Sequence, residues 1–371
     1  MSWVGLRDAR GGVFSPVGLG QASRGPFDLN AVMPCGTLML EFASDPRGGV
    51  QTLIDYGSSH PWAAGLRVTL DQNGLLTLFH WQGAQERHFT LETGLVCVTL
   101  SVVVTYTWDA PMRRGVLAVQ CPDQNLMLFP ELSAPLPLSM RDAMRVMADK
   151  CHCRTSSNAA FVALADEVVP IGVMPTLGAD VLIPTSEGDV AVSKIRAGQM
   201  VVTATGKLAQ VRWVGAATLP ARGRFAPLTM RAPYHGLCKD VTVAYDQQLR
   251  IRGPEVEYLF HTEQISLRVG DLRDGVAVRR APVALTQEYW QIVLDQPEPI
   301  AIANMEIEAM DISALRIDPA IKAHSVLASL PSELVPKETP NVWPILQPYE
   351  THSLQKLRVA LALQPLGTAL F

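Results

Sequence analysis

The sequence predicts a mainly β protein built from two modules. Short apolar runs rich in β-branched residues recur along most of the chain, and Gly, Pro and Asn separate them. Only two segments show helical spacing of apolar residues. The 371 residues, 48% of them hydrophobic, suffice for two domains with cores. We therefore expect an antiparallel, jelly-roll-like β-sandwich, a second all-β domain, and a short C-terminal arm with a helix.

Residues 1–138 are expected to form the sandwich. The candidate strands are Gly36–Phe42, Thr52–Tyr56, Leu66–Leu70, Leu75–Trp81, Val96–Tyr106 and Val116–Gln120. Asn73-Gly74 lies between the third and fourth of these and predicts a hairpin turn. The strand order loosely resembles that of concanavalin-type lectin folds, with the segment Thr105–Ala110 as the most similar piece.

The two helical patterns lie outside the predicted strands. Ser139–Lys150 has Ser139 as a candidate N-cap and methionines at helical spacing, so residues 139–173 are expected to form a helical linker. Residues 321–371 are expected to be the arm. Its segment Pro331–Pro348 is proline-rich and predicted to be extended, and Tyr349–Leu363 is predicted to be an amphipathic helix.

Composition excludes several classes of function. A net charge of -4 with 18% charged residues argues against nucleic-acid binding. The N-terminus resembles no signal peptide and no apolar run is long enough to span a membrane. The six cysteines show no framework spacing, which fits reduced thiols and synthesis in the cytoplasm. Association with a particle or a surface after release is a further expectation.

Three blocks between residues 174 and 320 resemble bacterial Hint (hedgehog/intein-type) domains. The stretch from Gly178 to Thr203 is similar to the opening "GTxIxTPxGxxxVExLxxGDxVxT", Gln210–Gly215 to "pxRWxG", and Ile302–Glu308 to a block near "LAxGxxxES". The resemblance implies an all-β fold that performs an N–S acyl shift. That reaction needs a Cys or Ser nucleophile at the start of the domain and a Thr/Ser-x-x-His element to protonate the departing nitrogen.

The resemblance also implies that these catalytic positions hold other residues. The nucleophile position matches Met174, the hydroxyl position Ala244 and the histidine position Gln247, and two further histidine positions hold Gln291 and Pro297. A thioether cannot be acylated productively, and an amide does not change charge near neutral pH. Thr176 could attack in principle but would lack its histidine. We therefore expect no autoproteolysis.

Candidate ligand and metal sites are less specific. Trp62, Trp81, Trp108 and Asp109 could bind a sugar if the sandwich presents them on a concave face, although large aromatic rings more often fill a core. The segment Cys151-His152-Cys153 is unsuited to hold one tetrahedral zinc without a second pair of ligands. No nucleotide-binding or other cofactor motif is present, so we expect no cofactor and no metal.

The sequence as a whole favours a non-enzymatic binding or structural protein, such as a component of a surface or phage-like assembly. Its expected partners are other proteins or glycans, and oligomers are compatible with this hypothesis. Two alternatives remain: an autoprocessing Hint protein that cleaves itself near Met174, and a glycan-binding, lectin-like adhesin.

Overall fold

The computed structural model describes residues 3–21, 27–45, 49–95, 99–282, 284–296, 298–310, 312, 315, 318–335 and 343–362, with side chains to residue 359. Several predicted features lie partly or wholly outside these residues: the start of the Val96 run, Cys97, Pro297, part of the proline-rich segment and Leu363. The chain divides into two compact units, Met1–Gly172 and Val173–Phe371. Each unit is described by itself.

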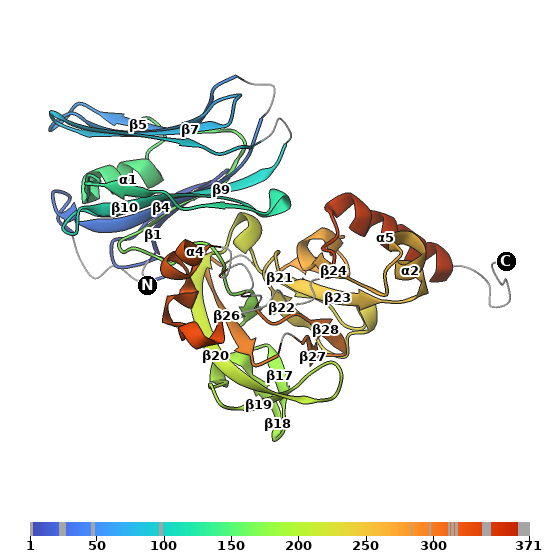
Figure 1. Ribbon diagram of the computed structural model, residues 1–371. Helices are drawn as coiled ribbons and strands as arrows, with labels where there is room; N and C mark the ends of the chain where they lie inside the picture. Colours follow the sequence, from blue (N-terminus) through green and yellow to red (C-terminus); the bar gives the residue numbers. More distant parts are fainter. Residues whose placement is uncertain are drawn as a thin grey trace. The chain divides into compact units, whose positions relative to one another are not determined.

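The first unit is an antiparallel sandwich of two main sheets, drawn in Figure 1 as two stacked layers. In hydrogen-bonding order, the eight-stranded sheet contains β11 (Leu126–Leu128), β10 (Arg114–Cys121), β9 (Ser101–Asp109), β4 (Cys35–Ala43), β15 (Ala159–Ala165), β1 (Trp3–Asp8) and β2 (Gly11–Phe14), with β12 (Glu131–Ser133) paired to β10. The five-stranded sheet contains β14 (Cys153–Thr155), β5 (Gln51–Ser58), β6 (Ala64–Leu70), β7 (Leu75–Gln82) and β8 (Gln85–Glu92). A short pair joins β3 (Val32–Met33) to β13 (Leu138–Ser139), and η1 covers Pro122–Gln124.

Alternating side chains of the two sheets meet in one core. The inward residues of β7 are Leu76, Leu78 and His80, and the residues between them face outward. This period-two pattern buries one face of the sheet. The turn Asp71–Gly74 joins β6 to β7 as predicted, because Gly74 adopts a positive φ of 80° that favours glycine.

Helix α1 (Met140–Ala148) is part of the first unit rather than a linker. Its N-cap is Ser139, as predicted, and the hydroxyl of Ser139 accepts a hydrogen bond from the Asp142 amide. Figure 1 shows the helix between the two sheets, and Val146 and Met147 are buried in the shared core. The segment after it forms β14 and the central strand β15, which pairs with both β1 and β4. The predicted linker 139–173 is therefore corrected, because its apolar residues complete the sandwich.

The second unit contains two further antiparallel sheets. In order, the nine-stranded sheet contains β18 (Gly188–Ala191), β17 (Leu182–Thr185), β19 (Met200–Val202), β20 (Leu208–Pro220), β26 (Thr286–Leu294), β16 (Leu177–Gly178), β22 (Val241–Val243), β21 (Leu228–Met230) and β25 (Val278–Arg280). The four-stranded sheet contains β24 (Gln264–Arg268), β23 (Gln248–Arg252), β28 (Met305–Ile307) and β27 (Ile300–Ile302). Its short helical segments are η2 (Val192–Lys194), η3 (Gly223–Phe225), η4 (Tyr234–Gly236), η5 (Val269–Leu272), α4 (Pro319–His324), η6 (Val326–Ser329) and η7 (Ser332–Leu334).

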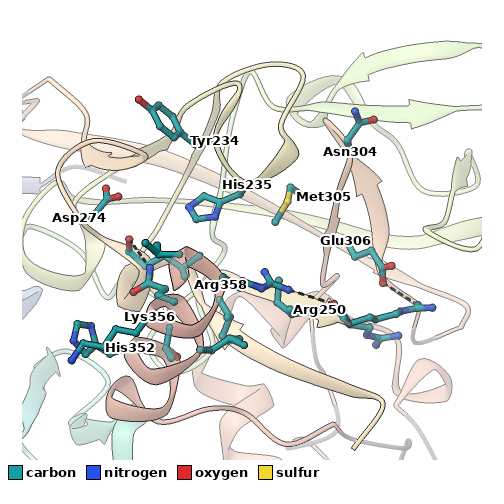
Figure 2. Close-up of a pocket in the computed structure, with 18 residues that line it drawn as sticks. Tyr234, His235, Arg250, Asp274, Asn304, Met305, Glu306, His352, Lys356 and Arg358 are labelled. Carbon is teal, nitrogen blue, oxygen red and sulfur yellow. Dashed lines mark hydrogen bonds and ion pairs between the residues drawn. The ribbon is translucent and has the colours of Figure 1, made fainter. Parts of the chain in front are cut away.

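Two helices, α2 (Pro254–Phe260) and α5 (Pro348–Ala362), pack together beside the four-stranded sheet. Helix α5 confirms the predicted C-terminal helix, and its Leu354 is buried in the core of this unit. Figure 2 shows residues of α5 across a cavity from Tyr234 and His235. Among the described residues, no helix is both long and apolar enough to cross a membrane.

Candidate functional site

A buried threonine lies at the start of the second unit. Thr176 directly precedes β16, a two-residue strand that pairs with β22 on one side and with β26 on the other. The Thr176 carbonyl accepts a hydrogen bond of 2.7 Å from the Ala244 amide, which extends the pairing toward β22. This position in the middle of a sheet explains why the Thr176 side chain is buried, at 9% exposure.

Two glutamine amides hold the hydroxyl of Thr176. The Oγ1 atom donates to Oε1 of Gln247 at 2.6 Å and accepts from Nε2 of Gln291 at 3.1 Å. Both glutamines are buried, and they lie 71 and 115 residues further along the chain. Gln247 follows the turn after β22 and Gln291 lies on β26. The fold thus brings together Gln247, Gln291 and Ala244 around the threonine that precedes β16.

The remaining amide groups of the two glutamines also have partners. Nε2 of Gln247 donates to the carbonyls of Gln248 and Glu308 at 2.9 and 3.0 Å. Oε1 of Gln291 accepts a longer bond of 3.3 Å from the Ile292 amide. Because buried polar groups are costly when unpaired, these hydrogen bonds favour one rotamer for each of the three side chains.

The network offers little for acid–base chemistry. Acyl transfer by a hydroxyl requires a base that removes its proton. Here the proton points to an amide oxygen, and neither glutamine can take it up near neutral pH. Met174, two residues before Thr176, is half-buried and carries a thioether without a transferable proton. Ala244 is buried and provides no hydroxyl at its position.

Charged groups near Gln247 form an ion pair and a cation–π contact. Arg224 is buried, its Nε donates to Oδ2 of Asp246 at 3.0 Å, and its guanidinium lies 4.5 Å from the centre of the Tyr245 ring. The Tyr245 hydroxyl donates to Asp271 at 2.5 Å. Burial, reinforced by this bond, raises the pKa of Tyr245 above its usual range. Tyr245 is therefore protonated, and the Asp246 carboxylate forms an ion pair with Arg224.

Sequence reasoning did not identify Arg224 or the central place of Thr176. An arginine in a Gly-Arg-Phe segment gives no local sign of burial. One feature of the sequence could have identified Thr176: it lies two residues before Gly178, the glycine that begins the family motif. Pro297, the remaining predicted histidine position, lies outside the described residues.

The four predicted sugar-binding residues do not form one site. Trp108 is fully buried and donates from Nε1 to the Met33 carbonyl at 3.1 Å, so its prediction as a ligand residue is wrong: the ring fills the sandwich core. Asp109 lies next to it on β9 and accepts from the Met112 amide in the β9–β10 turn. Trp81 lies on the other sheet, on β7, and Trp62 is in a loop and 48% exposed.

Trp81 lies flat against the outward face of the five-stranded sheet. A Cβ atom added at Gly65, its cross-strand neighbour, would lie 2.0 Å from the indole ring. The ring stacks on Phe79, with centroids 5.0 Å apart and an interplanar angle of 27°. Arg67, opposite Phe79, is paired with Asp55 at 2.9 Å. An aromatic surface with neighbouring hydrogen-bonding groups is therefore present on this face.

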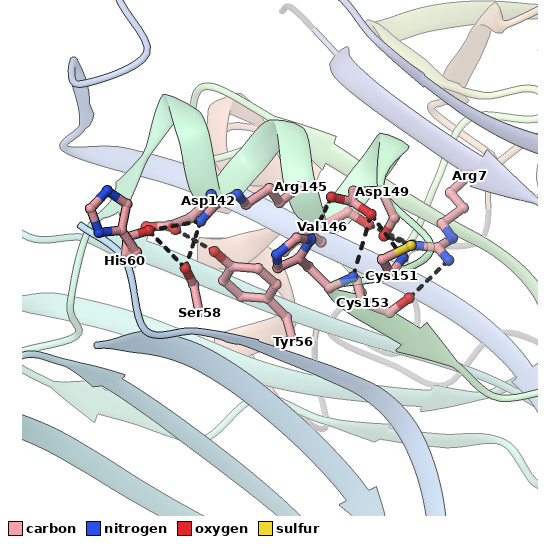
Figure 3. A network of polar contacts seen from close by, with 11 residues as sticks. Arg7, Tyr56, Ser58, His60, Asp142, Arg145, Val146, Asp149, Cys151 and Cys153 are labelled. Atoms are coloured by element: carbon pink, nitrogen blue, oxygen red, sulfur yellow. Dashed lines mark hydrogen bonds and ion pairs between the residues drawn. The ribbon is translucent and has the colours of Figure 1, made fainter. Parts of the chain in front are cut away.

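Cys151 and His152 lie in the turn after α1, Cys153 begins β14, and the segment is held by the end of the helix (Figure 3). The His152 ring lies 2.6 Å from Asp149, and the Arg7 guanidinium donates to the carbonyls of Val146 and Cys153 at 3.0 Å each. Cys153 is buried, where desolvation raises its pKa to about 11, and Cys151 is exposed. Within the described part of the chain, no three His, Cys, Asp or Glu side chains form a metal-binding group.

Comparison with known proteins supports an assignment for part of the second unit. Residues 175–313 match the family model described as the Hint domain. No curated protein matches the chain significantly. Among solved structures, the MchDnaB-1 intein (N145AA) is 14% identical, with 36% of this chain and 99% of the intein covered and a TM-score of 0.26.

Two other similar structures are a CBM40 module bound to sialyllactose and a bacteriophage tailspike protein. The CBM40 of the Ruminococcus gnavus IT-sialidase, bound to α2,6 sialyllactose, is 11% identical over 36% of this chain and 78% of its own, with a TM-score of 0.26. Tailspike protein 2 of Escherichia coli O157:H7 bacteriophage CAB120 is 10% identical over 37% of this chain and 20% of its own, with a TM-score of 0.28. These scores are too low to support an inference about ligands. The family match stands independently of them, and residues 175–313 of this chain are a Hint domain.

Proposed function

We propose that the chain is a non-enzymatic binding or structural protein in which the Hint domain serves as a scaffold. Its partners would be proteins of a larger assembly or glycans. One observation carries the proposal: the Thr176 hydroxyl, two residues after the expected nucleophile position, is held between two glutamine amides that cannot act as a base. A Met at position 174 and an Ala at position 244 support the same conclusion.

Intact mass spectrometry of the purified chain, with and without dithiothreitol, tests this proposal. We expect a single species of 40.4 kDa in both conditions. A product ending at Val173, or one that appears only with the thiol, would show autoprocessing and overturn the proposal. The triple variant Met174→Cys, Ala244→Thr, Gln247→His serves as a gain-of-function arm, with Met174→Cys alone as its matched control. We expect thiol-dependent cleavage only in the triple variant.

A second candidate function, glycan binding, is favoured by the Trp81–Phe79 surface. A partly exposed pair of stacked rings can lie against the apolar face of a sugar ring, and Arg67, Asp55 and His88 of the same face carry hydrogen-bonding groups for its hydroxyls. The residue expected to matter is Trp81, and Trp108 is excluded by its burial.

A glycan array with the full chain tests this second candidate. Trp81→Ala should abolish any signal, whereas Trp62→Ala, which removes a more exposed ring outside the sheet, should leave it intact. A signal that survives Trp81→Ala, or the absence of any signal in the wild-type chain, would remove glycan binding at this surface.

A further inference from the structure

A cavity of about 920 Å³ lies in the second unit between α5 and the four-stranded sheet (Figure 2). It is distinct from the Thr176 network, none of whose three side chains lines it. Its volume is within the range of small-molecule sites. Its floor is apolar and formed by buried side chains of the sheet, η5 and α5: Ile251, Leu267, Leu272, Met305 and Leu354.

The charges around this cavity are mostly paired, with one exception. Arg250 pairs with Glu308 at 2.8 Å, Arg252 with Glu306 at 3.0 Å, and Arg358 with Glu255 at 2.5 Å. The carboxylate of Asp274 accepts bonds from three backbone amides that follow it. Lys356, exposed at the rim, has no acidic or other hydrogen-bonding partner among the described residues. Among the described lysines and arginines that line the cavity, Lys356 is thus the one whose charge has no ion-pair partner.

A buried hydroxyl in the wall of the cavity also lacks a partner. Thr351 is 0% exposed, lines the cavity, and its Oγ1 has no hydrogen-bond partner within the described part of the chain. Leaving a buried hydroxyl unpaired costs about 1–3 kcal/mol. Side chains of an α-helix lean toward its N-terminus, so the Lys356 side chain extends over the turn that contains His352. Thr351 lies five residues before Lys356, on another side of the helix, and belongs to the buried wall of the cavity.

The opposite rim contains a residue in a backbone conformation that is uncommon outside glycine. His235 has φ 54° and ψ 19°, in the left-handed region, and lies between Tyr234 and a glycine that also has positive φ. Such residues concentrate at ligand sites, where the surrounding structure holds them in place. In Figure 2 the imidazole of His235 points toward the cavity, opposite α5.

We propose that this cavity binds a small amphiphile whose apolar body lies on the floor and whose anionic head group, a carboxylate or a phosphate, is bound by Lys356. The apolar floor favours a ligand with an apolar body, and the ammonium group of Lys356 favours a negatively charged head group. The site is independent of the proposed scaffold function, because it shares no side chain with the Thr176 network.

Isothermal titration of the full-length chain with dodecanoate tests the proposal. Dodecyltrimethylammonium, with the same chain and the opposite charge, and acetate, which lacks the chain, are the comparison ligands, all below their micellar concentrations. We expect saturable binding of dodecanoate, binding of the cation at least about tenfold weaker, and no binding of acetate. Absent binding of dodecanoate, or equal affinity for both dodecyl ions, would overturn the proposal.

Two variants with a matched control locate the binding. Lys356→Glu should weaken dodecanoate binding about tenfold or more, since a charge-assisted hydrogen bond is lost and a like charge is added. Lys150→Glu makes the same charge change at an exposed site of the first unit and should have no effect. Thr351→Val, which alters the buried wall but not the charge of Lys356, should change the affinity for dodecanoate by less than about threefold. Equal effects of the two lysine variants would place the ligand elsewhere and refute the assignment.

Discussion

Replacement of Thr176 by valine should lower the stability of the second unit, although it removes only one polar group. The substitution keeps the shape of the side chain but leaves Oε1 of Gln247 and one N–H of Gln291 without their partner in a buried site. Each unpaired buried group costs about 1–3 kcal/mol, and the added methyl group recovers about 1 kcal/mol of apolar burial. We expect a net loss of about 1–5 kcal/mol in the free energy of unfolding.

The matched control is Thr176→Ser, which keeps the hydroxyl and removes only a methyl group. Its expected cost is about 1 kcal/mol. Native-state hydrogen exchange across a denaturant series, read on peptides from residues 173–310, measures the free energy of opening in this unit without treating the two-unit chain as two-state. A Thr176→Val variant that opens no more easily than Thr176→Ser would refute the reasoning, because the hydroxyl would then contribute nothing through the two glutamines.

Three further predictions concern the first unit. Gly65→Ala should displace the Trp81 ring and red-shift tryptophan emission, whereas Gly57→Ala, whose added Cβ would lie 3.8 Å from the same ring, should leave the spectrum unchanged. Ser139→Ala should lower the free energy of opening of α1 by about 0.5–2 kcal/mol in native-state hydrogen exchange, because the N-cap of α1 is lost, and Ser353→Ala at an exposed position should not. Burial, with a smaller contribution from Arg87, lowers the pKa of His80 to about 3 from its ordinary value near 6.5, so the unfolded state binds the extra proton between these values. Neutral His80 therefore contributes its full share to the free energy of unfolding above pH 6.5, and this contribution falls by up to about 1.4 kcal/mol per pH unit below that pH. His80→Gln should flatten this pH dependence in thermal melts from pH 7 to pH 4, and His88→Gln should not.

Local patterns were sufficient for much of the sandwich but not for all of its strands. The hairpin at Asn73-Gly74 and the helix after Ser139 were predicted because a turn type and an N-cap are properties of neighbouring residues. Strand β8 was missed, since its outward residues are exposed and its sequence Gln-Glu-Arg-His lacks an apolar run. Strand β15 does contain an apolar run, Phe161–Ala165, but it follows a segment of mixed character that resembled a linker.

The candidate site depends on contacts that a local pattern does not encode. The family motifs located Gln247 and Gln291 separately, yet their common partner Thr176 is determined by the pairing of β16 with both β22 and β26. The same limit applies to Trp108. Its neighbours Thr105–Ala110 resemble a lectin strand, but a local pattern does not show that every residue from Val102 to Trp108 is buried.

The position of β15 has a consequence for how the chain is made. The N-terminal strand β1 has β15 and the short β2 as its partners in the sheet, and β15 is the last strand of the first unit to leave the ribosome. Until then, β1 and β4 each present an open edge that could pair with another chain. At about 5–20 residues per second, the roughly 120 residues from β4 to β15 take about 6–24 seconds to synthesise. A chaperone that covers these edges during that interval should raise the yield of folded protein.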